Sequence, residues 1–203
     1  MNIQLFIPCF VDQLYPDTAF NMIRVLEKAG CTVTYNAEQT CCGQPAFNAG
    51  FQDDAKEVCT KFLRDFTGAD YIVSPSASCT GFVRNYYPKL FADSSYNKQV
   101  KNTGKRIYEF SDFLVNVLHY ENFNASLPGK ATYHDSCAAL RECKIRQSGR
   151  GDWRRTRPRR IHRENAGPCR AHVYVMDYLP ASDIAWPSIR HTCAVVDMNV
   201  TTR

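Results

Sequence analysis

The sequence has no long apolar segment. None of its apolar runs approaches the roughly 18 residues that a membrane-spanning helix requires. The opening residues MNIQLFIPCF carry no basic stretch ahead of the apolar ones, so they do not resemble a secretory signal. We therefore expect a soluble, cytoplasmic protein without a membrane span.

Motifs that bind phosphate groups are also absent. The sequence contains neither the Gly-x-Gly-x-x-Gly pattern of dinucleotide-binding proteins nor the Gly-Lys-Ser/Thr ending of a phosphate-binding loop. An α/β fold does not by itself imply a bound nucleotide. The sequence therefore gives no indication of a bound nucleotide.

Lysine disappears from the last part of the chain. Residues 1–145 hold nine Lys and five Arg against fifteen acidic residues, a net charge of −1. Residues 146–203 hold eleven Arg and no Lys against five acidic residues, a net charge of +6. This tail shows no clear helix or strand period before about residue 171. Two interpretations are open: a disordered basic extension, or translation in a shifted reading frame.

The arginine run of the tail is the feature that could bind nucleic acid. Residues 154–160, RRTRPRR, could attract phosphates, and Trp153 could stack on a base. Runs of like charge are more often solvated segments. We therefore do not expect nucleic-acid binding.

Ten cysteines are distributed along the chain. A disulfide framework is typical of small secreted domains that lack an adequate core. At 203 residues and 44% hydrophobic content, however, this chain can bury a sizeable core. Thiols in a reducing compartment more often serve metal or redox chemistry, and we favour that interpretation.

Strands and helices alternate along the first part of the sequence. The apolar run Asn2–Pro8 predicts a buried strand followed by a loop, and a helix then begins at Pro16 and ends near Gly30. Further strands are expected at 31–35 and 71–73, and further helices at 53–67 and 110–119. This order predicts an α/β fold with a Rossmann-like parallel sheet.

Two cysteines follow predicted strands directly. Cys9 comes just after the first strand, and Cys79 follows the strand at 71–73 through the short segment SPSAS. In parallel α/β sheets, ligands commonly bind outside the carboxyl ends of the strands. We therefore expect Cys9 and Cys79 to lie at that edge of the sheet.

The cysteine spacing points to a shared metal centre. Cys9 is followed by 31 residues, the triplet Cys41-Cys42-Gly43, 35 further residues and Cys79. Adjacent cysteines do not readily pair with each other in a disulfide, yet both thiolates can reach one polynuclear centre. Gly43 has no Cβ, so the backbone can turn closely around such a centre.

This spacing is similar to the CCG repeat of cysteine-rich iron–sulfur proteins: Cys, thirty-odd residues, Cys-Cys-Gly, thirty-odd residues, Cys-x-x-Cys. The segments FIPCFVDQLYP, CCGQPAFNAG and SPSASCTGFVRNYYP resemble the lactate-utilisation protein A branch of that family. This branch is related to the cysteine-rich subunit of heterodisulfide reductase and to the iron–sulfur subunit of glycolate oxidase. The resemblance covers about residues 1–145.

The resemblance implies a cofactor, its ligands and a function. Cys9, Cys41, Cys42 and Cys79 would bind an iron–sulfur cluster of 4Fe–4S type, cubane or non-cubane, with zinc as the alternative. Cys137 would be the first metal ligand of a second module. The function implied is that of an electron-transfer subunit in a complex that oxidises L-lactate to pyruvate. Its partners would be the other subunits of that complex, and the chain would not be a stand-alone enzyme.

The sequence departs from the CCG pattern in two places. Phe82 occupies the last position of Cys-x-x-Cys, and no second Cys-Cys-Gly follows Cys137. We therefore divide the chain into a first CCG module at residues 1–127, the incomplete start of a second module at 128–145, and the irregular, atypical tail at 146–203.

Two further cysteines and one His-Asp pair are expected to have structural roles, whereas Cys143 stays open. Cys59 lies on the apolar face of its helix and Cys31 at a strand start, so both are expected in the core. Cys143 could be a ligand or a bystander. His134 and Asp135 could form an acid–base pair, but we favour a role in shaping their loop, and no catalytic residue is predicted.

Two other functions stay open. A thiol–disulfide active site of heterodisulfide-reductase type would let the cluster meet a substrate disulfide. A structural zinc module would bind partners without redox chemistry. The iron, sulfide and zinc content of the protein separates the redox classes from the structural one.

Overall fold

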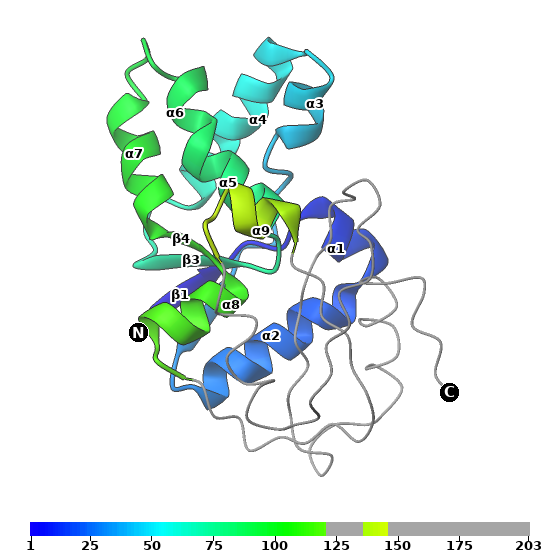
Figure 1. Ribbon diagram of the computed structural model, residues 1–203, viewed down its shortest axis with the longest axis vertical. Coiled ribbons are helices and arrows are strands. Elements are labelled where there is room, and N and C mark those ends of the chain that lie inside the picture. Colours follow the sequence, from blue (N-terminus) through cyan, green and yellow to red (C-terminus); the bar gives the residue numbers. More distant parts are fainter. Residues whose placement is uncertain (121–135, 146–203) are drawn as a thin grey trace.

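The computed structural model describes residues 1–120 and 136–145. Among these residues, four strands form a parallel sheet in the order β2-β1-β3-β4 (Figure 1). The strands are β1 (Asn2–Leu5), β2 (Thr32–Tyr35), β3 (Tyr71–Ser74) and β4 (Ile107–Glu109). The predicted α/β fold with a parallel sheet is confirmed.

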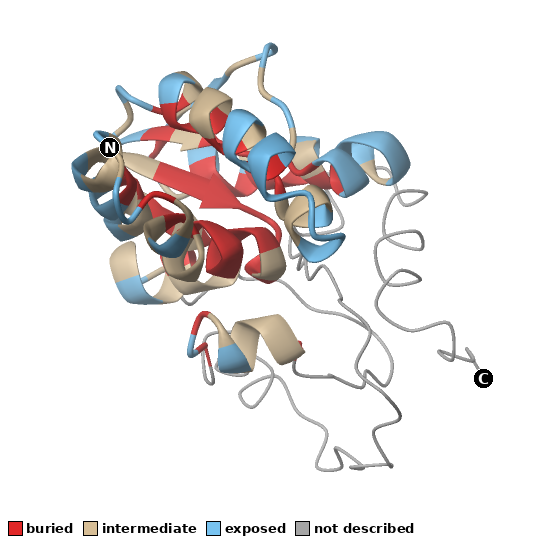
Figure 2. Ribbon diagram, turned by 90° about the horizontal axis from the view of Figure 1, so that it is seen from above, coloured by how far each residue is buried: buried red, intermediate tan, exposed pale blue. Residues whose placement is uncertain are grey.

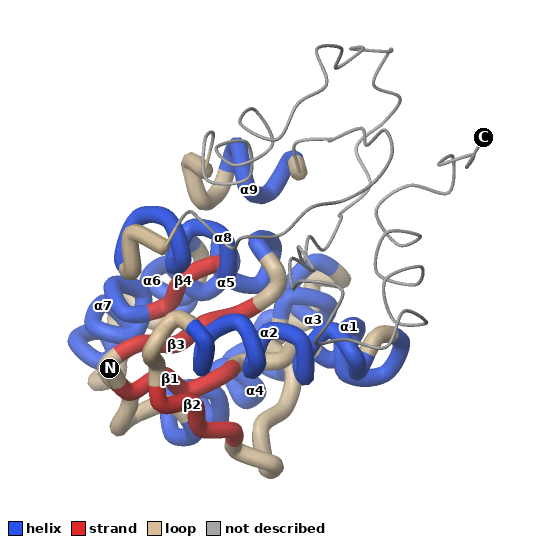
Figure 3. The backbone as a smooth tube through the Cα atoms, turned by 90° about the horizontal axis from the view of Figure 1, so that it is seen from below, coloured by secondary structure: helices blue, strands red, loops and turns tan. Residues whose placement is uncertain are grey.

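Helices cover both faces of the sheet (Figures 1 and 3). On one face lie α2 (Pro16–Lys28), α8 (Phe110–Asp112) and the π-helical turn η1 (Phe113–Val117). On the other face lie α4 (Gln52–Asp65), α5 (Ala77–Asn85), α6 (Tyr87–Leu90) and α7 (Asn97–Arg106). The short helices α1 (Cys9–Leu14) and α3 (Gln44–Asn48) lie toward the carboxyl ends of the strands, and α9 (Cys137–Arg141) packs against α5.

Alternating side chains of the central strands fill two separate cores, so the sheet is buried on both faces (Figure 2). Ile3 and Leu5 face the α2-side core, whereas Phe6 faces the α4-side core. The α2-side core is built from Ile3, Leu5, Ile7, Val11, Met22, Val25, Leu26, Cys31, Val73, Phe110, Phe113 and Leu114. The α4-side core is built from Phe6, Cys42, Cys59, Phe62, Leu63, Phe66, Ile72, Cys79, Phe82, Val83, Tyr87, Phe91, Val100 and Ile107.

The prediction of a loop directly after the first strand is wrong. The chain forms α1 directly at Cys9, where the sequence suggested only a loop. Pro8 is extended (φ −63°, ψ 151°), and its carbonyl accepts a hydrogen bond from the Asp12 N–H, which starts the helix. Only Val11 of this short helix is buried, so no apolar period marks it in the sequence. The segment expected as one helix at 110–119 consists of α8 and η1.

Residues 136–145 dock on α5. The Asn85 side-chain amide donates to the backbone carbonyl of Glu142 (3.0 Å) and to its carboxylate (2.9 Å). A Cβ at Gly81 would stand 2.5 Å from the Cβ of Glu142, so the glycine permits this close approach. The start of the proposed second module is thus attached to the helix that carries Cys79.

Several predictions fall outside the described residues: those for His134 and Asp135, and those for the tail at 146–203. The module boundaries at 127 and 145 therefore stay predictions. Within residues 1–120 and 136–145, no helix has the length and apolarity needed to cross a membrane.

Glu109 ends β4 and caps α8 with a buried side chain. Its carboxylate accepts hydrogen bonds from the N–H groups of Ser111 (3.0 Å) and Asp112 (3.1 Å). Burial nevertheless raises the pKa of Glu109 from 4.5 to about 7, and the charge of Asp112 adds to the shift. The folded protein therefore binds a proton here more tightly than the unfolded chain does.

This shift predicts a pH-dependent stability. The contribution of Glu109 to the free energy of unfolding is fully present below the unfolded pKa of 4.5. It is lost as the pH rises through the folded pKa of about 7. The free energy of unfolding should fall by about 3 kcal/mol over that window. Glu109→Gln keeps an oxygen acceptor for the cap but cannot titrate, so it should remove this loss. Urea unfolding at about pH 5 and about pH 8 measures the difference, and an equal loss in both proteins would contradict the assignment.

Candidate metal centre

The strand order places a topological switch point at the carboxyl ends of β1 and β3. From β1 the chain runs first to β2 on one side, and it later returns to β3 on the other side. The loops that leave β1 and β3 therefore diverge, and such a switch point is where α/β sheets bind ligands. Cys9 follows β1 and Cys79 follows β3. Both cysteines thus flank the switch point of the sheet.

Four thiols meet at this edge: those of Cys9, Cys41, Cys42 and Cys79. The Sγ atoms of Cys9 and Cys41 lie 3.6 Å apart. Cys42 and Cys79 belong to the same buried cluster, and Cys41 packs against it. All four are free thiols.

Burial increases from one side of this thiol group to the other. Cys9 is exposed at the start of α1, and Cys41 is half-buried. Cys42 and Cys79 belong to the α4-side core, and Cys42 is only 1% exposed. The thiol group therefore has a solvent-facing side at Cys9 and an interior side at Cys42 and Cys79.

The pKa values divide the four thiols into two pairs. A hydrogen bond with the Cys42 thiol, helped by donation from the Gly43 N–H (3.4 Å), lowers the pKa of Cys41 to about 5. A hydrogen bond with Cys42 also lowers the pKa of Cys79. The same bonds raise the pKa of Cys42 well above its ordinary value, while partial burial and the bond to Cys41 raise that of Cys9 to about 11. Cys41 and Cys79 thus favour the thiolate form, which is the form that binds metals.

Cys79 is positioned by the start of α5. Ser76 precedes the helix in an extended conformation, and its hydroxyl accepts a hydrogen bond from the Cys79 N–H (3.3 Å). This N-cap fixes the first turn of the helix, which contains Cys79. Hydrogen bonds from Ser76 and Ser78 to the Cys79 sulfur help to lower its pKa.

Gln39 connects the two loops that carry Cys9 and Cys41. Its side-chain oxygen accepts from the Ile7 N–H (2.8 Å), just before Cys9. Its side-chain amide group donates to the carbonyl of Asn36 (3.1 Å) in its own loop. The loop after β1 and the loop before Cys41 are therefore held together by one side chain, which the cysteine spacing gave no reason to single out.

Gly43 brings the Cys-Cys-Gly turn against α4. Its φ is +88°, in the left-handed region that favours glycine. A Cβ here would stand 3.0 Å from Cys59 Sγ and 3.2 Å from the carbonyl oxygen of Ala55. The expectation that Gly43 allows a close turn is confirmed, because its φ favours glycine and a Cβ would be in tight contact with α4.

Phe82, at the last position of the Cys-x-x-Cys pattern, lies in the α4-side core and is almost fully buried. Its ring centroid lies 5.2 Å from that of Phe47, 5.5 Å from that of Tyr87 and 5.7 Å from that of Tyr86. This position is therefore filled by aromatic packing, and the first module offers the four thiols named above.

The other predicted cysteines are placed as follows. Cys31 and Cys59 are buried, as expected. Cys59 also touches the thiol site, since its Sγ donates to the carbonyl of Cys42 (3.5 Å). Cys143 is buried and donates to the Ala77 carbonyl (3.2 Å), which favours the bystander interpretation. Cys137 begins α9, and its role as a ligand stays a prediction.

The donor set suits a group bound through thiolates. Over residues 1–120 and 136–145, no three Cys, His, Asp or Glu side chains are arranged to hold a metal ion as they stand. The chemistry of the edge nevertheless fits, because four free thiols are gathered there and two of them have lowered pKa values. Cys9, Cys41, Cys42 and Cys79 are the residues that could hold such a group.

One protein-family model matches the part of the chain that holds the thiols. A family model described as a cysteine-rich domain, CCG, matches residues 3–84, a range that contains all four thiols. Residues 3–84 are therefore similar to the cysteine-rich CCG domains.

Several curated proteins named lactate utilization protein A are similar to this chain. The protein from Geobacillus thermodenitrificans is 42% identical over 142 residues, which is 70% of this chain and 59% of the relative. That from Halalkalibacterium halodurans is 41% identical over 141 residues, 70% of this chain and 58% of the relative. Lactate utilization protein A 2 of Bacillus cereus is 37% identical over 148 residues, 72% of this chain and 61% of the relative. The match thus spans about three-fifths of these relatives. No solved structure matches the chain.

Proposed function

We propose that the chain is an iron–sulfur electron-transfer subunit of a complex that oxidises L-lactate to pyruvate. The observation that carries the metal-binding part is the meeting of four free thiols, Cys9, Cys41, Cys42 and Cys79, at the carboxyl edge of a parallel sheet. The lactate part is supported by the names of the relatives, which match this chain over about 70% of its length.

The chain's own groups would hold and tune the cluster. A bound iron–sulfur cluster supplies one-electron oxidation and reduction. Cys41 and Cys79 contribute sulfurs that already accept hydrogen bonds, from the Gly43 N–H and from Ser76 and Ser78. Hydrogen bonds to ligand sulfurs and burial are the features through which a protein sets a cluster potential.

The exposed side of the site suggests where electrons enter or leave. Cys9 is exposed, whereas Cys42 and Cys79 are buried. Two large apolar side chains of α1, Phe10 and Leu14, are exposed beside Cys9. Electron transfer requires close approach of a partner, and this side offers the shortest path from the thiols to solvent. We therefore place the partner subunit at α1.

The test is the metal content of the protein purified without oxygen. We expect iron and acid-labile sulfide in the full chain, with visible absorption that bleaches on reduction. Stoichiometric zinc without iron or sulfide would contradict the proposal and would select the structural zinc module.

The Cys9–Cys41 pair favours a second candidate, a thiol–disulfide site. With their sulfurs 3.6 Å apart, one thiolate could attack a substrate disulfide and release one thiol. The other would then attack the mixed disulfide, release the second thiol and leave a Cys9–Cys41 disulfide. Reduction of a small disulfide by the isolated reduced chain, lost in Cys9→Ser, would select this function.

A further inference from the structure

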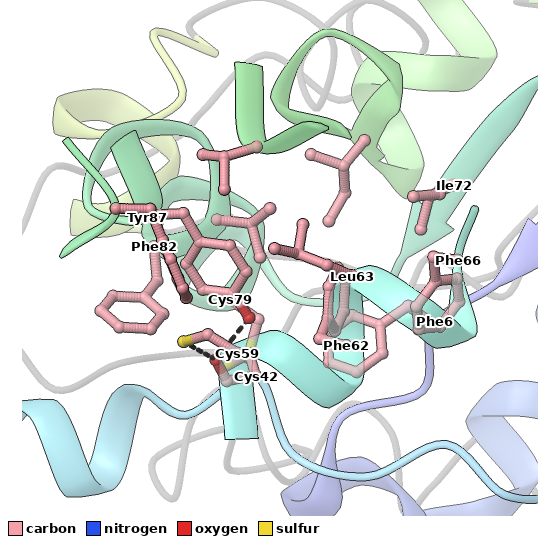
Figure 4. Close-up of a cluster of buried hydrophobic side chains, with 14 residues drawn as sticks. Phe6, Cys42, Cys59, Phe62, Leu63, Phe66, Ile72, Cys79, Phe82 and Tyr87 are labelled. Atoms are coloured by element: carbon pink, nitrogen blue, oxygen red, sulfur yellow. Dashed lines mark hydrogen bonds between the residues drawn. The ribbon is translucent and has the colours of Figure 1, made fainter. Parts of the chain in front are cut away.

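The backbone carbonyl of Cys42 accepts hydrogen bonds from two side chains that lie far apart in the sequence. The hydroxyl of Tyr87, at the start of α6, donates to this oxygen at 2.7 Å. The thiol of Cys59, on α4, approaches the same oxygen at 3.5 Å. Figure 4 shows both side chains directed toward Cys42, with Cys79 close by. These two hydrogen bonds therefore fix the orientation of the peptide group that joins Cys42 to Gly43.

The ring of Tyr87 is fixed in place. Its side chain is completely buried in the α4-side core. Its centroid lies 5.5 Å from that of Phe82 and 5.7 Å from that of Phe62, both in edge-to-face contact, and 6.3 Å from that of Phe91. Because these rings leave the phenol little freedom, its hydroxyl stays directed toward the Cys42 carbonyl.

Packing against α4 also confines this peptide. A Cβ on Gly43 would be in tight contact with Cys59 Sγ and the Ala55 carbonyl oxygen. A rotation of the Cys42–Gly43 peptide would either break the bond to Tyr87 or push the turn into α4. The directions of the Cys41 and Cys42 side chains depend on that peptide, since Cys41 precedes it by one residue and Cys42 forms part of it.

We propose that Tyr87 is a positioning residue of the thiol site, whose hydroxyl fixes the Cys-Cys-Gly turn so that the Cys42 thiol stays between Cys41 and Cys79. The assignment rests on the proposed thiolate site and adds to it a residue of the core that no cysteine pattern includes. Cys59 assists through a weaker bond, because a thiol is a poorer donor than a hydroxyl.

The test is Tyr87→Phe, read by the alkylation rate of each cysteine. Phenylalanine keeps the ring packing and removes only the hydroxyl, which leaves a buried carbonyl short of its stronger donor. In the reduced, metal-free full chain, the turn should open more often, so iodoacetamide should modify Cys42 about tenfold faster or more. Peptide mass spectrometry follows each cysteine separately.

Cys31 serves as the internal standard. It is buried in the α2-side core, on the opposite face of the sheet, and takes no part in the thiol site. If the hydroxyl only contributes to global stability, the rates at Cys31 and Cys42 should rise by the same factor. That result, or an unchanged rate at Cys42, would overturn the proposal.

Tyr86→Phe is the matched control. Tyr86 is the neighbouring residue, also stacks on Phe82, and directs its hydroxyl to Glu142 at 3.5 Å and not to Cys42. Loss of the Tyr86 hydroxyl should leave the alkylation rate of Cys42 unchanged. The alkylation test is made on the metal-free chain, so its result does not depend on which metal the protein binds. A chain that binds zinc would contradict the proposed function, and the test would still decide the role of Tyr87.

Discussion

Replacing Cys42 by serine is expected to remove nearly all iron and acid-labile sulfide from the anaerobically purified protein. Cys42 is the most interior of the four thiols, and it lies between Cys41 and Cys79. Serine has nearly the same size, so the fold should persist. Its hydroxyl is a hard, neutral ligand where a cluster takes soft thiolates. Cys41→Ser should have the same effect, and both are measured by iron and sulfide analysis per chain.

Cys31→Ala is the control for these variants. Cys31 is buried to a similar degree, but it packs in the α2-side core, away from the thiols. Its loss should lower stability without lowering the iron content of the folded protein. If the serine variants at 41 and 42 held as much iron as Cys31→Ala, these thiols would not be the ligands.

Gly43→Ala should destabilise the protein strongly and disrupt the thiol site as well. An alanine at φ +88° costs about 1–2 kcal/mol in backbone energy. Its Cβ would also stand 3.0 Å from Cys59 Sγ and 3.2 Å from the Ala55 carbonyl oxygen, and overpacking of this kind costs about 1–3 kcal/mol. We expect a loss of about 2–5 kcal/mol in the free energy of unfolding, measured by urea denaturation, together with a lower iron content.

Gly30→Ala separates the two costs. Gly30 has a similar φ of +84°, follows α2, and has nothing within 4 Å of its missing Cβ. The Gly30→Ala variant should therefore lose only the backbone part of the free energy of unfolding, and its iron content should be unchanged. Equal destabilisation by both substitutions would mean that contact with α4 does not confine the Cys-Cys-Gly turn.

The fold was predictable where an element is long or buried on both sides. β1 and β3 are short apolar runs, and the apolar faces of α2 and α4 repeat at helical spacing, so each was placed within a few residues. α1 could not be predicted because it buries only Val11. β4 spans only Ile107–Glu109, too few residues for a period to show, and it is defined by its pairing with β3.

The thiol site was predictable as a set of residues but not as a structure. The predicted strands put Cys9 and Cys79 at one edge of the sheet, and the resemblance grouped them with Cys41 and Cys42. The structure brings Cys9 to Cys41 and packs Cys41, Cys42 and Cys79 together. Nothing in that spacing indicates Gln39 or Tyr87, because each acts through a hydrogen bond to backbone atoms of a distant segment. Such contacts depend on where the backbone runs, which a pattern of residue types does not specify.

The central position of β1 has a consequence for the order in which the protein can mature. This strand is synthesised before β2 and β3, yet it lies between them and pairs with both. The parallel pairing of β1 with β3 and the arrival of Cys79 both wait until the chain has been synthesised through α5. Non-local pairing of this kind slows folding. The nascent chain therefore exposes Cys9, Cys41 and Cys42 as an unfinished set of thiols before the last member arrives, and reducing conditions are needed throughout synthesis to keep them from oxidising.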